Sequence, residues 1–297
     1  MILSKQDFEN ATAFELYILE RICQPRTVGG GSELDLRSQP SQANIHTVME
    51  EGASGKGVSK LKSELTPLIF GAAWKAIDLL LEFALNKANL SSGKEWRINE
   101  KEKHAQAANG DMTVLGCTQP VWKALMSLYA STVEHRHCLV HRTANVDYKL
   151  GTLSGMSKKN QPLLPLTFEQ MEAFAKIGVI VIRATTQGHI ESRSEDQLKY
   201  FLDRLTAHTK KPSFGVVGSN VPVTIRLDLQ ENGDHFLLDM TKVIQQARQI
   251  YSDTRYFDLK IGIPDGSGRL LFARAEDCPT AVQAIYLNAI PSWLQFR

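Results

Sequence analysis

The stretch from Pro67 to about Ala88 constrains the fold more than any other part of the sequence, because it is strongly apolar but still carries charges. Pro67 suits the first turn of a helix, where a missing N–H group costs no hydrogen bond. The large apolar residues that follow would lie on nearly every side of that helix: Ile69, Phe70, Trp74, Ile77, Leu80, Leu81 and Leu85. An apolar surface all round predicts a central helix that other elements cover.

No part of the sequence is expected to cross a membrane. Charged residues interrupt the longest apolar candidate, between Leu65 and Leu90, whereas a membrane span needs roughly 18 apolar residues in a row. The first twenty residues lack the basic start, apolar run and cleavage site of a signal peptide. The four cysteines are widely scattered, which favours free thiols in a reducing compartment. A cytoplasmic protein is therefore expected.

Helical patterns also occur before and after the apolar stretch. Apolar residues recur at helical spacing over the first twenty or so residues, and again from Val121 to about Asn145. The sequence Thr167-Phe168-Glu169-Gln170 is a capping box that predicts the start of a further helix, and residues 194–206 form a shorter amphipathic one. These patterns predict a mainly α chain, with a helical bundle over residues 1–210.

Two segments depart from the helical pattern. Residues 26–60 are polar and rich in glycine and serine, which predicts a long loop or flexible insertion. From residue 211 on, the pattern alternates as in strands, with hairpin signals at Glu231-Asn232-Gly233 and Asp265-Gly266-Ser267-Gly268. Residues 211–297 are therefore expected to form a smaller α/β module of unknown role.

The segment Arg136-His137-Cys138-Leu139-Val140-His141 holds the residues best suited to chemistry, and it comes at the end of a predicted helix. Cleavage of RNA without a metal needs a base for the ribose 2′-OH, an acid for the departing 5′ oxygen, and cations near the phosphate. Histidine suits the proton transfers because its ordinary pKa, about 6.5, is close to cellular pH. Arginine stays charged and can bind two phosphate oxygens at once.

This segment resembles the motif of the HEPN family (higher eukaryotes and prokaryotes nucleotide-binding), in which Arg is often followed by Asn, His or Asp and then, after three residues, by His. The resemblance covers residues 1–210 in architecture but only six residues in sequence. It implies a HEPN-like helical bundle and a metal-independent endoribonuclease that acts as a homodimer on RNA. Arg136 and His141 would be catalytic, and His137 would assist or orient them. Many family members are toxins or antiviral defence effectors, so an antitoxin or a defence complex is a further partner that the resemblance allows.

Neighbouring polar residues extend the candidate site. His135 and Arg142 are candidates for holding an RNA phosphate, and Asn145 for a hydrogen bond near the site; each is equally compatible with an ordinary exposed or helix-terminal position. Cys138 is interpreted as a packing residue, since no motif requires its thiol. No metal or other cofactor is expected, because no carboxylate or cysteine completes a set of ligands with the histidines.

Two other patterns are weaker. The segment Gly52-Ala53-Ser54-Gly55-Lys56-Gly57 has some of the residues of a phosphate-binding loop but not its first glycine or its hydroxyl residue. Asp258-Leu259-Lys260 matches the end of a metal-dependent nuclease motif, as many unrelated strands do. The net charge of +2 is too small to indicate nucleic-acid binding by itself.

Three functions stay open at this point. The first is the metal-independent endoribonuclease. The second is a non-catalytic HEPN-like adaptor or nucleotide-sensing protein, and the third is a metal-dependent DNA nuclease that uses the C-terminal module.

Overall fold

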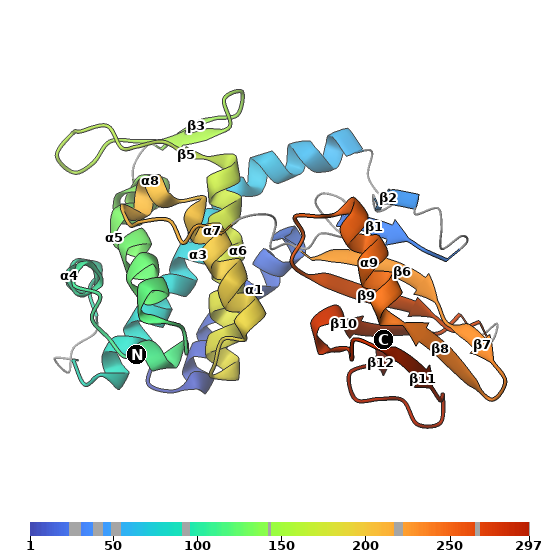
Figure 1. The fold of residues 1–297 in the computed structure, drawn as a ribbon. Helices are drawn as coiled ribbons and strands as arrows, with labels where there is room; N and C mark the ends of the chain where they lie inside the picture. Colours follow the sequence, from blue (N-terminus) through green and yellow to red (C-terminus); the bar gives the residue numbers. More distant parts are fainter. Residues whose placement is uncertain are drawn as a thin grey trace. The chain divides into compact units, whose positions relative to one another are not determined.

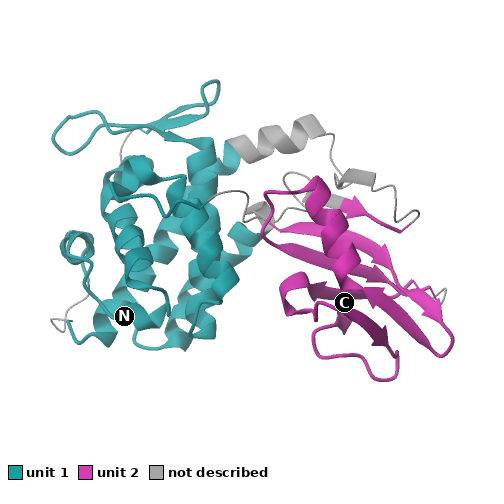
Figure 2. Cartoon of the chain, in the orientation of Figure 1, with its two compact units in different colours: residues 1–28, 52–216 teal, residues 29–51, 217–297 magenta. Residues whose placement is uncertain are grey.

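The computed structural model describes residues 1–23, 31–37, 44–48, 55–90, 96–141, 144–216, 222–264 and 268–296. The chain divides into two compact units, residues 1–28 with 52–216 and residues 29–51 with 217–297 (Figure 2). Helices dominate the first unit, and strands are the commonest elements among the described residues of the second (Figure 1). The expectation of a mainly α chain is wrong: the described residues contain three sheets, and the class is mixed α/β.

The first unit is built around α3 (Gly55–Lys87), against which α1 (Lys5–Cys23) and α6 (Phe168–Gln187) pack. The central buried helix expected from the sequence is confirmed, since the large apolar side chains of α3 from Ile69 to Leu85 are buried. Its expected start is wrong: Pro67 lies inside the helix, because twelve further residues continue it on the N-terminal side.

Two carboxylates of α3, those of Asp78 and Glu82, have partners inside the unit. Lys101, on α4 (Ile98–Gln106), is 3% exposed, and its Nζ lies 2.5 Å from Asp78 Oδ2 and 3.6 Å from Glu82 Oε2. The hydroxyl of Tyr129, on α5 (Gln119–His141), donates to Asp78 Oδ1 at 2.7 Å. Ile2 N–H donates to Glu82 Oε1 at 3.0 Å. A charged helix can therefore lie in a core, because its carboxylates have partners there.

A small antiparallel sheet follows α5 in the chain. Its strands are β3 (Asn145–Asp147), β4 (Thr152–Ser154) and β5 (Leu166–Thr167), in the order β3-β4-β5. Thr167 is also the N-cap of α6, where the expected capping box is confirmed: its side chain accepts from Gln170 N–H and the Gln170 side chain accepts from Thr167 N–H. The unit also contains η1 (Met112–Val114), α7 (Ser192–Asp203) and α8 (Thr206–Thr209).

The second unit has a six-stranded sheet in the order β12-β10-β9-β6-β1-β2. Its strands are β1 (Gly31–Asp35), β2 (Asn44–Val48), β6 (Val223–Asp228), β9 (Phe257–Gly262), β10 (Leu270–Arg274) and β12 (Gln295–Phe296). The strand β6 is parallel to both β1 and β9, and the other pairs are antiparallel. A second, three-stranded sheet contains β7 (Gln230–Asn232), β8 (His235–Asp239) and β11 (Val282–Ile285), and α9 (Met240–Ile250) follows β8.

The prediction of a loop over residues 26–60 is wrong for those of its residues that the structure describes. Residues 31–35 and 44–48 are strands of the second unit's sheet, and α3 begins at Gly55. Leu34 pairs with Ile225 of β6, and both side chains are fully buried. Local composition gave no sign of this strand, because its partner lies about 190 residues further along the chain. Of the glycine-rich segment 52–57, residues 52–54 lie outside the described residues and 55–57 are the start of α3.

None of the helices within the described ranges is long and apolar enough to cross a lipid bilayer.

The close contact of α6 with α3 and α1 depends on Gly178. A Cβ atom there would lie 2.8 Å from Ala73 Cβ and 3.2 Å from Leu19 Cδ1. We expect Gly178→Ala to lower the free energy of unfolding by about 1–3 kcal/mol, the usual cost of overpacking, despite the better helix propensity of alanine. Urea denaturation followed by circular dichroism measures the change.

Gly71→Ala is the matched control, since a Cβ at this helical glycine would meet its nearest neighbour, Leu139 Cδ2, at an ordinary 3.4 Å. This variant should keep the free energy of unfolding or raise it by up to about 1 kcal/mol. Equal stability of the two variants would contradict the proposed packing.

Candidate functional site

The candidate site lies in the last two turns of α5. Upstream, the helix buries Val121, Trp122, Leu125, Leu128 and Val133, which fix it in the first unit. Arg136 and His137 are half-buried, and His141, the last residue of the helix, is exposed. A packed helix therefore delivers the motif to the surface at its C-terminal end.

The structure brings Arg136 and His141 together. Arg136 Nη1 lies 3.2 Å from His141 Nε2. A guanidinium group can only donate, so a hydrogen bond here makes His141 Nε2 the acceptor, which requires the tautomer with its hydrogen on Nδ1. Neutral imidazole is the form that a proton-accepting base requires.

The guanidinium group of Arg136 packs on a pair of aromatic rings. Its Cζ lies 5.5 Å from the centre of the Trp74 ring, within the range of a cation–π interaction. Trp74 is 2% exposed and stacks on Tyr129 with ring centres 4.9 Å apart and an interplanar angle of 22°. Burial, and then the nearby carboxylate of Asp78, raise the pKa of Tyr129 far above its usual value, so the phenol stays neutral and continues to donate to Asp78.

His137 lies beside this pair. Its ring centre is 5.9 Å from that of His141. Burial lowers the pKa of His137, and the charge of Lys158 lowers it further, so the ring is neutral at pH 7. Its Nε2 is buried and has no hydrogen-bond partner among the described residues.

Lys158 belongs to this site, although no sequence pattern singled it out. Its backbone N–H donates to Glu134 Oε2 at 3.1 Å, and its Nζ lies 3.6 Å from Glu134 Oε1. Glu134, two residues before Arg136, therefore pairs with Lys158 of the loop after β4. The only local signal was the pair Lys158-Lys159, which is common in exposed loops.

The other candidates from the sequence are not brought to the Arg136–His141 pair. His135 is 3% exposed, and its Nε2 lies 2.7 Å from the carbonyl oxygen of Leu164, to which it donates. Asn145 is exposed as the first residue of β3, and its carbonyl oxygen accepts from Ser154 Oγ at 3.4 Å. Arg142 lies outside the described residues.

Cys138 packs inside the unit. Its thiol is 2% exposed and donates to the carbonyl oxygen of Met156 at 3.2 Å. A Cβ atom at Gly155 would lie 2.7 Å from Cys138 Sγ, so the close approach of the loop requires glycine there. Across the described part of the chain, no group of three or more histidine, cysteine, aspartate or glutamate side chains could hold a metal ion.

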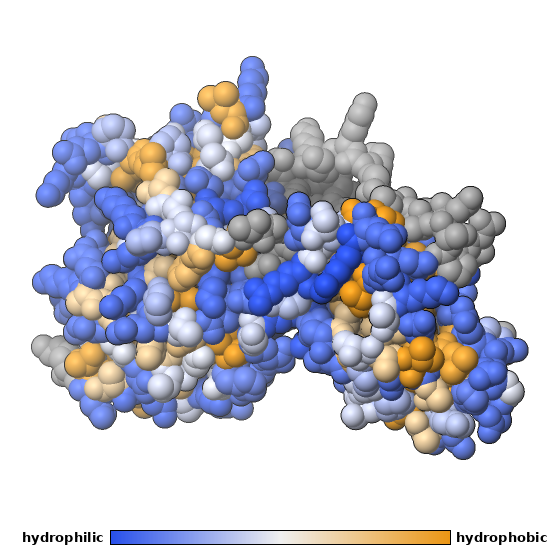
Figure 3. Space-filling model, viewed as in Figure 1, coloured by the Kyte–Doolittle hydropathy of each residue, from blue (hydrophilic) through white to orange (hydrophobic). Residues whose placement is uncertain are grey.

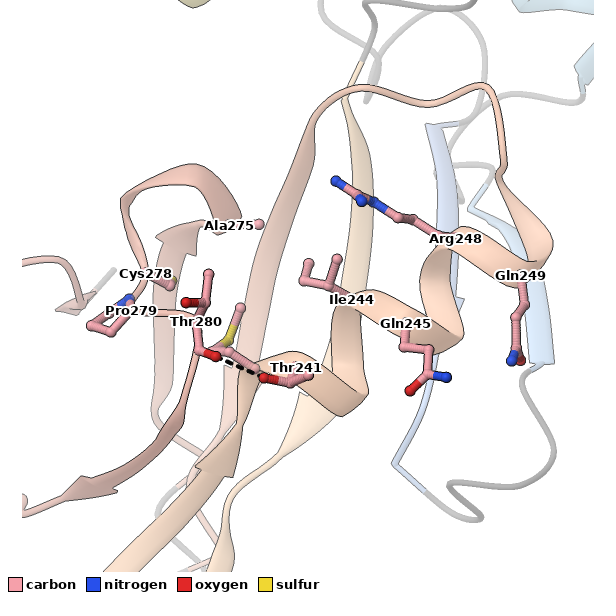
Figure 4. A pocket seen from close by; sticks show the side chains of 10 residues that line it. Thr241, Ile244, Gln245, Arg248, Gln249, Ala275, Cys278, Pro279 and Thr280 are labelled. Atoms are coloured by element: carbon pink, nitrogen blue, oxygen red, sulfur yellow. Dashed lines mark hydrogen bonds between the residues drawn. The ribbon is translucent and has the colours of Figure 1, made fainter.

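The second unit has a groove of its own, about 640 Å³ in volume (Figure 4). One wall is α9, with Thr241, Gln245 and Arg248, and the other is the turn from Ala275 to Thr280. Thr241 Oγ1 donates across the groove to the carbonyl oxygen of Thr280 at 2.7 Å. Asp258, the residue of the weak nuclease pattern, is in β9 and does not line it.

Comparisons with protein-family models, with curated proteins and with solved structures find no match to this chain.

The buried histidines next to the site make stability depend on pH. The ring of His135 lies 5.6 Å from that of His208, which is 3% exposed. Burial, and then the charge of His135, lower the pKa of His208 to about 4 from its ordinary value of 6.5. Between these values the unfolded chain binds a proton that the folded chain does not, so stability is lost as pH falls through this window.

We expect the free energy of unfolding to fall by about 3 kcal/mol between pH 7 and pH 4 through His208 alone. Urea denaturation at several pH values measures this slope. His208→Gln should flatten it, whereas His189→Gln, at an exposed histidine, should leave it unchanged. An equal slope in all three proteins would refute the assignment.

Proposed function

We propose that this protein is a metal-independent endoribonuclease whose reaction centre is Arg136 and His141. The observation that supports the proposal is the 3.2 Å contact between the guanidinium and the imidazole, at an exposed helix end. It places a permanent cation for a phosphate beside an imidazole, the side chain best suited to proton transfer. The resemblance of residues 136–141 to the HEPN motif names the same two residues.

The reaction follows from these groups. When the guanidinium of Arg136 turns from His141 Nε2 to the phosphate, Nε2 becomes free to take the proton of a ribose 2′-OH. The 2′ oxygen then forms a bond to phosphorus, and the bond from phosphorus to the 5′ oxygen breaks. The departing 5′ oxygen takes up a proton, which leaves one RNA end as a 2′,3′-cyclic phosphate and the other as a 5′-OH. Arg136 binds the phosphate oxygens as negative charge develops on them.

A homodimer belongs to the proposal, because one chain offers one exposed histidine in the motif and the reaction needs a base and an acid. A two-fold axis that passes close to the end of α5 would supply a second histidine and a second arginine. A role as a toxin or a defence effector, with an antitoxin or a defence complex as partner, is part of the same proposal and rests on the resemblance alone.

We expect Arg136→Ala and His141→Ala each to reduce cleavage of single-stranded RNA by roughly 10²–10⁴-fold, the usual contribution of such groups. Cleavage should persist in EDTA and leave 2′,3′-cyclic phosphate ends. Gel electrophoresis of a labelled oligonucleotide, with mass spectrometry of the ends, measures both. Both variants should unfold within about 1 kcal/mol of the wild-type chain, because each side chain is at least partly exposed.

His189→Ala is the matched control, an exposed histidine in the same unit, and it should cleave at the wild-type rate. Wild-type cleavage by both motif variants would overturn the proposal. A chain that binds RNA or nucleotide under all conditions but never cleaves it would instead be a non-catalytic adaptor or sensor.

A further inference from the structure

The turn between β3 and β4, residues 148–151, presents large apolar side chains to solvent. Tyr148 is 55% exposed, and Leu150, at 76%, is the most exposed of the large hydrophobic side chains in the described residues. Figure 3 shows apolar side chains next to hydrophilic ones where this sheet projects. Exposed apolar groups that gather at one place are typical of a binding surface.

The turn is rigid before any ligand binds. Asp147 Oδ1 accepts from the N–H groups of Lys149 and Leu150 at 2.8 and 2.9 Å. Phe168 N–H donates to the carbonyl oxygen of Gly151 at 2.7 Å, and Gly151 has the positive φ of +62° that the turn needs. A surface held in one conformation loses little entropy when a ligand binds.

The ring of Tyr148 packs against another aromatic ring. It meets the ring of Phe168 edge to face, with centres 5.9 Å apart and an interplanar angle of 74°. Phe168 is the first residue of α6, so a helix of the core holds the aromatic pair in place. The exposure of Tyr148 leaves ring surface on which a flat group can stack.

The sheet that carries the turn, with its loop, has more positive than negative charge. Residues 144–166 contain three lysines and one carboxylate, and that carboxylate, Asp147, already accepts the hydrogen bonds of the turn. Lys149 and Lys159 are exposed. An exposed aromatic ring among lysines is the combination that binds the bases and phosphates of single-stranded nucleic acid.

Hydrogen bonds join the loop between β4 and β5 to α5, beside the proposed reaction centre. Cys138 donates to the carbonyl oxygen of Met156 at 3.2 Å, His135 bonds to that of Leu164 at 2.7 Å, and Glu134 accepts from Lys158. Only seven residues separate Tyr148 from His141, which limits the distance between their Cα atoms to about 25 Å. One short RNA strand can therefore reach both.

We propose that Tyr148 stacks on a base of single-stranded RNA and that Lys149 binds a neighbouring phosphate, so that the turn positions the substrate for Arg136 and His141. This inference rests on the proposed function. It assigns the turn a binding role and no part in the bond-making steps.

The test is the affinity of the full chain for a fluorescein-labelled ten-nucleotide oligouridylate, measured by fluorescence anisotropy in the His141→Ala background to prevent cleavage. Tyr148→Ala should weaken binding about tenfold, and Tyr148→Phe should bind within twofold of the parent. Lys149→Ala should reduce the slope of log affinity against log salt by about 0.7. Tyr17→Ala is the matched control, since Tyr17 of α1 is 58% exposed and should not change binding.

The outcomes separate this inference from the proposed function. If the parent protein binds no oligouridylate, or if Tyr148→Ala binds as tightly as Tyr148→Phe, the inference is wrong, whatever the cleavage assay shows. If binding depends on Tyr148 but the wild-type chain cuts no RNA, the inference stands and the nuclease proposal fails. If Tyr148→Ala instead changes the mass in light scattering and leaves RNA affinity intact, the turn is a protein contact and the inference is overturned.

Discussion

Lys101 is the group on which the helical unit depends. A carboxylate in an apolar core is costly unless a partner compensates for its lost hydration, and α3 brings two of them, Asp78 and Glu82, into the interior. The nearly fully buried ammonium of Lys101 pairs with both, the amino group of Met1 lies 3.9 Å from Glu82 Oε1, and Tyr129 donates to the other oxygen of Asp78. Removal of the lysine would take away the cation that both carboxylates share, and an apolar helix can hold two such charges only when they have partners of this kind.

This buried pairing is connected to the candidate site through aromatic rings. The hydrogen bond to Asp78 fixes Tyr129, Tyr129 stacks on Trp74, and the face of Trp74 holds the guanidinium of Arg136. Each contact joins α3 to α5, so the same interactions that align the two helices also place Arg136 within reach of His141. The position of the exposed pair is thus a consequence of core packing.

The sequence predicted elements whose signals are local. The apolar stretch of α3, the capping box at Thr167 and the hairpin turn at Gly233 between β7 and β8 are all confirmed, because each depends on neighbours within a few residues. The strand β1 was missed, since a polar segment of five residues becomes a strand only when β6 pairs with it. Lys158 was missed for the same reason: its closeness to His137 exists only after the loop folds back on α5.

Helix geometry explains why the sequence alone could not distinguish the roles of the polar residues at the motif. Residues 134 to 137 are consecutive and polar, and read along the chain they form one cluster. Successive residues of an α-helix point about 100° apart, so the cluster divides around α5. Glu134, His135 and Cys138 hold the loop and sheet that follow, whereas Arg136 turns toward Trp74 and meets His141. Glu134, His135 and Cys138 hold the sheet that carries the turn at Tyr148, and Arg136 with His141 forms the reactive pair. The turn and the reactive pair therefore depend on the same two turns of α5.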